Sequence, residues 1–355
     1  MNARENLLSL YRRTGYNYMP VEFDLCPSLE TEYKKRTNSK LGYEEYFDMP
    51  FRRVGDLTPA DTNTDRFLKY HTPDLKPGTT IDDFGLAHEP GSEAAKHMTY
   101  LRSPLRGVDS FDVIKEYPYP DFTKCDASFQ KAEADAIHAK GHVALGSCTC
   151  TIWEFSWYLR GMEDLMMDMM SDDPIAEFIL DKVTEINLHR ASSFVHAGCD
   201  IINLGDDIGM QSRIMMSEEL YVEWLKPRLK RFITTLKAIN PNVLIMYHSC
   251  GYVKPLIGHL IDAGIDILNP VQPECMSFEE IHSEYGGALS FNGTIGTQSV
   301  MPFGTPEEVR ENVFKNLDIA GKRGGLMVCP THMLEPEVPW KNIIAYVEAC
   351  KEYMG

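Results

Sequence analysis

The chain has 355 residues, of which 43% are apolar, so it can bury the core of one large α/β domain or of two ordinary ones, and we expect one. It carries 35 lysines and arginines against 52 aspartates and glutamates, and its formal net charge is −17. This acidic balance, with no basic run, argues against nucleic acid or an anionic membrane as a partner. No apolar run reaches the roughly 18 residues that a membrane span needs.

Cysteine usage indicates the redox compartment. The nine cysteines are an odd number, and the first 14 residues are charged with a helical pattern, unlike a signal peptide. We therefore expect a cytoplasmic protein whose thiols act as metal ligands, nucleophiles or core residues.

The N-terminal third has a loose pattern. Residues 1–14 predict an amphipathic helix and 20–27 a first strand closed by proline. Residues 28–78 are polar without a sustained period, and we interpret them as a lid or elaboration rather than a separate domain. Residues 79–90 predict a second strand, and 91–125 are rich in turn signals.

The rest of the chain alternates regularly between strand and helix patterns. Six apolar runs, each followed by a helical pattern, lie at 141–148, 199–207, 242–251, 264–273, 288–296 and 325–332. With the two earlier strands they make eight, which favours a single (β/α)8 barrel over residues 1–355. No dinucleotide-binding fingerprint follows any strand, which weighs against an open doubly wound sheet.

Polar and soft side chains follow these apolar runs. His248 and Cys250 are two residues apart at the end of one strand, so they face the same side. Asp206 and Asp207 end another strand, and Cys329 another. Because the carboxyl ends of barrel strands form the active site, we expect these residues to lie near one another.

One imidazole and two thiolates suit zinc, and three protein ligands leave a fourth position for substrate. His248, Cys250 and Cys329 are the candidates, although Cys329 is far from the pair in sequence and the fold must bring it there. The alternatives are that Cys329 is a small buried core residue and that His248 is a hydrogen-bonded core histidine.

Several stretches carry a family resemblance, namely NLGDDIG, YHSCG, DILNPVQPE, FGTPEEVRENV and GGLMVCPTHMLEPEVPWKNI. With them the second half of the chain resembles the uroporphyrinogen decarboxylase superfamily, in particular its corrinoid-dependent methyltransferase branch. That resemblance implies a (β/α)8 barrel and a zinc site formed by a His-x-Cys pair and a distant cysteine. These positions are His248, Cys250 and Cys329 in this sequence.

The resemblance also implies methyl transfer between a small substrate and the corrinoid of a separate carrier protein. The chain has no Asp-x-His-x-x-Gly motif of corrinoid carriers, so it is expected to be the catalyst. We favour O-demethylation of a methoxylated aromatic compound, because four aromatic residues lie where a lid would be: Trp153, Phe155, Trp157 and Tyr158. The alternative direction is transfer from the methylcorrinoid protein to a thiol such as coenzyme M.

Two further questions stay open from the sequence. Asp206 and Asp207 are candidates for a catalytic role, as partners of His248, as a fourth zinc ligand or as an acid, and the alternative is a pair of helix caps. The decarboxylases of the superfamily have an arginine-rich motif after the first strand, whereas residues 24–30 here contain no arginine. A metal-free decarboxylase-like enzyme or binding barrel is therefore the weaker alternative.

Overall fold

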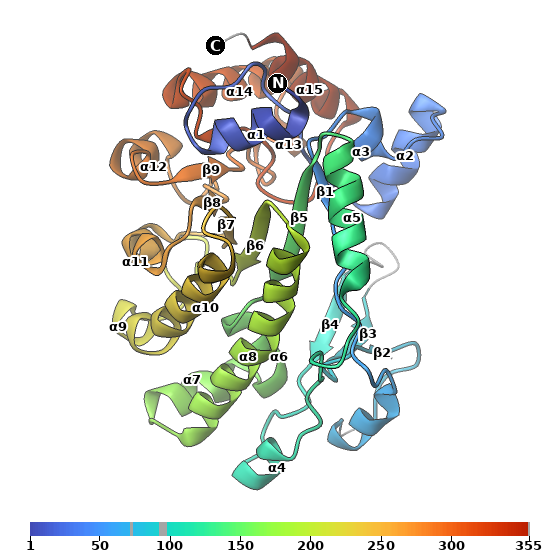
Figure 1. The fold of residues 1–355 in the computed structure, drawn as a ribbon, viewed down its shortest axis with the longest axis vertical. Helices are drawn as coiled ribbons and strands as arrows, with labels where there is room; N and C mark the ends of the chain where they lie inside the picture. The colour runs from blue at the N-terminus through green and yellow to red at the C-terminus, as the bar shows by residue number, and fades with distance from the viewer. Residues whose placement is uncertain (72–73, 92–97, 354–355) are drawn as a thin grey trace.

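The computed structural model describes residues 1–71, 74–91 and 98–353 (Figure 1). Its central feature is a curled parallel sheet with the strand order β1-β5-β6-β7-β8-β9-β10. These strands are β1 Phe51–Arg53, β5 Val143–Thr149, β6 Ile201–Gly205, β7 Leu244–His248, β8 Ile267–Asn269, β9 Ser290–Asn292 and β10 Leu326–Met327. Neighbours in the sheet follow one another along the chain from β5 onward, which confirms the predicted barrel type of α/β fold.

In place of an eighth strand, the extended segment around Leu25 completes the barrel. Leu25 forms a parallel bridge with Leu334, after β10. Cys26 N donates to Leu334 O at 3.0 Å, and Leu334 N donates to Asp24 O at 2.8 Å. The first predicted strand, 20–27, thus lies where the barrel closes.

Helices cover the outside of the sheet (Figure 1). Two of the longest, α8 and α14, begin at residues whose side chains cap them. Thr305 and Glu308 form a capping box on α14, and Asp173 caps α8 ahead of Pro174. The helices are α1 Ala3–Tyr11, α2 Pro27–Thr37, α3 Tyr43–Tyr46, α4 Phe111–Lys115, α5 Ser128–Ala139, α6 Trp153–Arg160, α7 Met162–Met170, α8 Pro174–Ala197, α9 Glu218–Leu220, α10 Lys226–Ile239, α11 Ile257–Ala263, α12 Phe278–Tyr285, α13 Val300–Phe303, α14 Pro306–Ala320 and α15 Trp340–Glu352.

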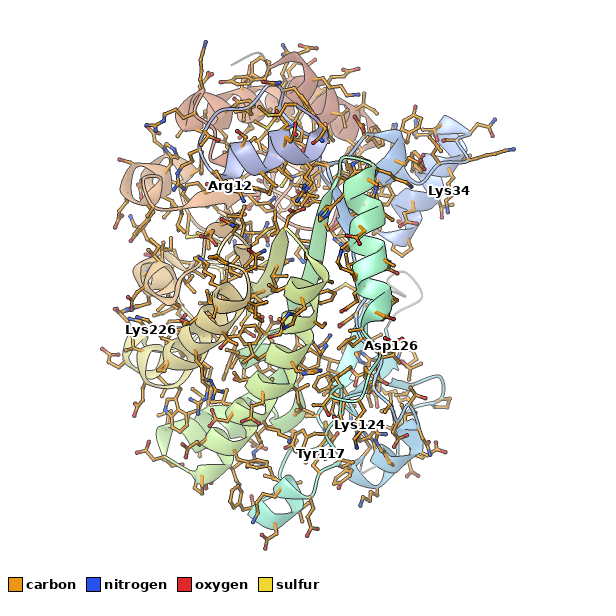
Figure 2. All side chains as sticks on the ribbon, in the orientation of Figure 1. Arg12, Lys34, Tyr117, Lys124, Asp126 and Lys226 are labelled. Atoms are coloured by element: carbon orange, nitrogen blue, oxygen red, sulfur yellow. The ribbon has the colours of Figure 1, made fainter. Side chains whose placement is uncertain are left out.

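Shorter turns complete this outer layer: a 3-10 helix at Thr64–Tyr70, a π-helical turn at Tyr221–Leu225 and a 3-10 turn at Lys254–Leu256. Figure 2 shows side chains projecting outward around the whole layer, among them Lys34 on α2. In the described part of the chain, no helix has the length and apolar character to cross a membrane.

The prediction of the second barrel strand was wrong. Residues 79–90 instead form β2 Thr80–Ile81 and β3 Ala87–Pro90, which pair antiparallel with each other, and β4 Thr99–Arg102 adds the third strand. The true second strand is β1, and it lies inside 28–78, the stretch expected to be a lid or elaboration. This strand, Phe-Arg-Arg, is too short and too highly charged to show an apolar alternation.

The three-stranded sheet packs on the barrel through its own apolar cluster. Phe67, Phe84 and Tyr117 pack with Ile179 and Val183 of α8. The main core fills the barrel and the space under its helices. At the end of the barrel where the strands begin, α1 is tied down by Arg4 N donating to Gly141 O at 2.7 Å. The opposite, carboxyl end stays open for a site.

Candidate metal centre

A pocket of about 520 Å³ lies at the carboxyl ends of the barrel strands. Every part of the wall contributes to its lining, from the extended first segment through β1 and the ends of β5 to β10. The lining residues are Glu22, Phe23, Asp24, Arg53, Leu145, Ser147, Thr149, Cys150, Glu154, Tyr158, Asn203, Asp207, Met246, His248, Asn269, Asn292, Cys329, Pro330, Thr331, His332 and Met333. This is the position that the barrel fold predicts for a functional site.

Three potential metal ligands converge beside this pocket. One ligand atom each of Asp207, His248 and Cys250 lies within 4.8 Å of the other two. His248 Nε2 is 3.4 Å from Cys250 Sγ and 3.7 Å from Asp207 Oδ1. The expectation that His248 and Cys250 point to the same side agrees with this geometry.

The backbone around these ligands is tightly packed. Gly205 of β6 lies opposite His248 in the parallel ladder, and His248 lies opposite Asn269 of β8. A Cβ atom on Gly205 would come within 2.6 Å of the His248 Cβ, so only glycine fits there. Cys250 N donates to Asp207 Oδ1 at 2.8 Å, which turns that carboxylate toward the strand carrying the other two ligands.

The tautomer of His248 is set by two asparagines. Asn269 Nδ2 donates to Asn292 O at 3.0 Å and to Asn292 Oδ1 at 2.6 Å, so its Oδ1 faces the imidazole. His248 Nδ1 lies 2.6 Å from that Oδ1 and must donate to it. The proton therefore sits on Nδ1, and Nε2 is left as a lone-pair donor toward Cys250 and Asp207.

Cys329 lines the same pocket but lies outside the group of three. It is buried, and its Sγ donates to Asn292 Oδ1 at 3.3 Å. Burial, followed by the nearby Glu22 carboxylate, raises the pKa of the Cys329 thiol well above its ordinary value. Cys329 is thus joined to His248 through Asn292 and Asn269, while Asp207 takes the third place in the convergent group. The role of Cys329 as a zinc ligand stays a prediction.

The two adjacent aspartates have different positions. Asp206 is 3% exposed, and its carboxylate accepts hydrogen bonds from Ile152 N and Glu154 N at 3.0 Å at the start of α6. Burial, followed by the Glu154 charge, raises the pKa of Asp206 well above its ordinary value. Asp206 therefore has the geometry of a cap for α6, whereas Asp207 lines the pocket.

Sequence reasoning did not single out the carboxylates that accompany Asp207. Glu154 Oε2 accepts from Asp207 N at 3.0 Å, and Glu154 Oε1 accepts from Tyr158 OH at 2.8 Å. Burial, followed by Asp207, raises the pKa of Glu154. The four-residue spacing of Glu154 and Tyr158 on a helix that follows a strand end was the available signal. Arg53 gave none, because a charged residue in a polar stretch resembles surface.

The donor set fits zinc. Zinc takes imidazole nitrogen, thiolate sulfur and carboxylate oxygen in four-coordinate sites, and all three converge here. Burial, followed by Asp207, raises the pKa of Cys250 to about 12, so the protein alone holds it as a thiol. A bound dication would supply the charge that favours the thiolate.

Comparisons with known proteins give the family. Residues 93–353 match the family described as Uroporphyrinogen decarboxylase (URO-D). A solved methyltransferase from Methanosarcina mazei superposes with a TM-score of 0.68 at 16% identity, covering 100% of both chains, which supports the fold.

Two curated relatives come from Methanosarcina species. The methylated-thiol--coenzyme M methyltransferase of Methanosarcina mazei is 27% identical over 55% of this chain and 49% of its own length. The methylcobamide:CoM methyltransferase MtaA of Methanosarcina barkeri is 25% identical over 55% of this chain and 54% of its own length. The matched regions span about half the length of these relatives. Because the family match covers most of the chain, this protein belongs to the uroporphyrinogen decarboxylase family.

Proposed function

We propose that this protein is a zinc-dependent methyltransferase that moves a methyl group between a small thiol and the corrinoid of a separate carrier protein. The observation that carries the proposal is the convergence of Asp207, His248 and Cys250 beside a pocket at the carboxyl end of the barrel. The names of the two curated relatives, both coenzyme M methyltransferases, support a thiol as the substrate.

Zinc would be held by His248 Nε2 and Cys250 Sγ, with either Asp207 or Cys329 as the third protein ligand, which leaves a fourth position for the thiol. When bound there, zinc supplies the Lewis acidity that lowers the pKa of a coordinated thiol and so makes it nucleophilic near neutral pH.

The chain's own residues would orient the ligands and handle the proton. Asn269 holds the proton of His248 on Nδ1, so that Nε2 stays available. A thiol that accepts a methyl group must also release its proton. The carboxylate of Glu154 lines the pocket, is held by Tyr158 OH and by Asp207 N, and would accept that proton.

The proposal chooses the thiol direction over O-demethylation of a methoxylated aromatic compound. Of the four aromatic residues expected to form a lid, Tyr158 lines the pocket. Trp153 is fully buried in the main core, and Phe155 packs against Phe84 with ring centroids 4.3 Å apart. Trp153 and Phe155 thus do not form the expected lid, and a methoxylated aromatic substrate stays an untested prediction.

The corrinoid is expected on a partner protein that approaches the open, carboxyl end of the barrel. There the pocket is bordered by residues from the first extended segment, α6 and the loop after β10. A carrier that inserts its corrinoid at this end would bring the methyl group to the candidate metal ligands.

The test begins with metal content. Elemental mass spectrometry of the purified protein should find about one zinc per chain, and His248→Ala and Cys250→Ala should both lose it. Cys329→Ser and Asp207→Asn would show which residue completes the site. Cys125→Ser is the matched control, because its thiol bonds to Thr58 O outside this pocket and zinc should be retained.

The activity test uses methylcobalamin as a soluble methyl donor and small thiols as acceptors. Loss of the methyl–cobalt absorbance and formation of the thioether, followed by mass spectrometry, should both depend on His248 and Cys250. Absence of zinc after metal supplementation would contradict the proposal and leave a metal-free barrel. Failure of the zinc-loaded protein to methylate any thiol would also contradict it.

A further inference from the structure

We propose that this pocket selects a thiol whose non-reacting end carries an ammonium or hydroxyl group, and that it disfavours anionic thiols such as coenzyme M. The inference rests on the proposed function and concerns the same site. It would distinguish this protein from the curated relatives, whose names give coenzyme M as the thiol.

The charges that line the pocket are mostly negative. Four carboxylates line it, those of Glu22, Asp24, Glu154 and Asp207. Among the described lining residues, Arg53 is the one lysine or arginine, and it already bonds both Asp24 oxygens at 3.3 and 3.2 Å. The Arg53 charge also acts on Glu22, whereas Glu154 and Asp207 have no hydrogen bond or ion pair with a lysine or arginine among the described residues.

A bound zinc ion would not make the net charge of the pocket positive. Its two positive charges would be offset by the Cys250 thiolate and by one further anionic ligand, Asp207 or Cys329. Glu22 and Glu154 would still line the pocket, and Glu22 is charged above its pKa of about 7. Burial lowers the pKa of the lining His332, which favours its neutral form. A sulfonate entering this pocket would therefore meet like charges, which is costly inside a protein.

The hydrogen-bonding groups of the pocket also favour a ligand that donates hydrogen bonds. Asn292 Nδ2 donates to Glu22 Oε2 at 3.1 Å, and Asn292 is joined through Asn269 to His248. Hydrogen bonds through Asn292 and Asn269 thus link Glu22 to His248. Asn203 also lines the pocket, with its Oδ1 buried and without a hydrogen-bond partner. Acceptors of this kind bind an ammonium or hydroxyl group, whereas a sulfonate can only accept.

The experiment compares three thiols with the same two-carbon length and different charge. They are cysteamine, 2-mercaptoethanol and coenzyme M, which end in an ammonium, a hydroxyl and a sulfonate. With methylcobalamin as donor and zinc-loaded protein, kcat/KM should be at least about tenfold higher for cysteamine than for coenzyme M. The neutral thiol should fall between them.

Variants separate the pocket from the intrinsic reactivity of the thiols. At pH 8, above the Glu22 pKa of about 7, Glu22→Gln keeps the shape and removes a charge, so it should lower the cysteamine to coenzyme M ratio about fivefold or more. Arg53→Gln should raise the same ratio. Glu163→Gln is the control, because Glu163 lies on α7 with 85% of its side chain exposed, and the ratio should not change.

Coenzyme M used as well as cysteamine would overturn the inference while leaving the methyltransferase proposal intact. So would an Arg53→Gln variant that loses coenzyme M activity alone, because Arg53 would then be an anion anchor. If no thiol is methylated and no zinc binds, the proposed function itself fails, and the inference fails with it.

Discussion

His248 Nδ1 donates a 2.6 Å hydrogen bond to Asn269 Oδ1, and this contact decides which nitrogen of the imidazole can bind a metal. Asn269 is held in turn by Asn292, so the orientation of the amide is fixed before any metal arrives. The candidate metal centre is thus supported by a layer of side chains behind its ligands.

We expect Asn269→Leu to weaken zinc binding by about 10- to 100-fold, because it removes the acceptor that holds the His248 proton on Nδ1. Competition with a chromophoric chelator measures the affinity. Asn312→Leu, an exposed asparagine on α14 that donates to Glu308 O, should leave it unchanged. Equal affinity in both variants would mean that Asn269 does not set the tautomer.

Asp206→Ala should destabilise the protein by about 2–4 kcal/mol, because buried N–H groups of Ile152 and Glu154 would lose their acceptor. Asp173→Ala removes an ordinary cap of α8, whose side chain accepts from Ile175 N, and should cost about 1 kcal/mol. Urea unfolding measures both. An Asp206 variant with full stability and no activity would favour a catalytic role instead.

The Glu22 carboxyl predicts a pH dependence of stability. Burial raises its pKa from 4.5 to about 7. The folded state therefore binds more protons than the unfolded chain between these values, and this group's contribution to stability decreases as pH rises through that range.

For metal-free protein, Glu22→Gln should match the wild type near pH 4.5 and exceed its stability at pH 8 by about 1–3 kcal/mol. Urea unfolding at the two pH values checks the difference between the proteins. A variant that is less stable than the wild type at pH 8 would show that the charged form of Glu22 is favoured in the fold.

Gly205→Ala should cost about 1–3 kcal/mol or more and weaken metal binding, because the added Cβ would lie 2.6 Å from the His248 Cβ and 2.8 Å from its backbone nitrogen. The matched change is Gly258→Ala on α11, where nothing lies within 4 Å, and it should be neutral or slightly stabilising. Thermal unfolding and zinc content test both. Similar stability in the two variants would contradict the close approach of β6 to β7.

The sequence predicted the second half of the barrel because β5 to β10 lie in apolar runs separated by helical patterns. It also predicted that His248 and Cys250 would face one side, since that follows from the period of a strand. It did not locate β1, because Phe51–Arg53 has no apolar alternation. Nor did it choose between Asp206 and Asp207, because their roles depend on where α6 begins, which is a tertiary relationship.

Because of the way the barrel closes, two sides of its pocket are held by different kinds of contact. His248 ends β7, and Asp207 and Cys250 lie two residues after the ends of β6 and β7, which are joined by a continuous five-residue ladder from Ile201↔Leu244 to Gly205↔His248. The segment carrying Glu22 is attached by the Leu25↔Leu334 bridge and by the hydroxyl of Tyr346, which donates to Glu22 O at 3.1 Å. Val21, Phe23 and Leu25 of this segment are buried in the main core, so packing by alternate side chains, in place of a ladder, keeps Glu22 and Asp24 at the pocket.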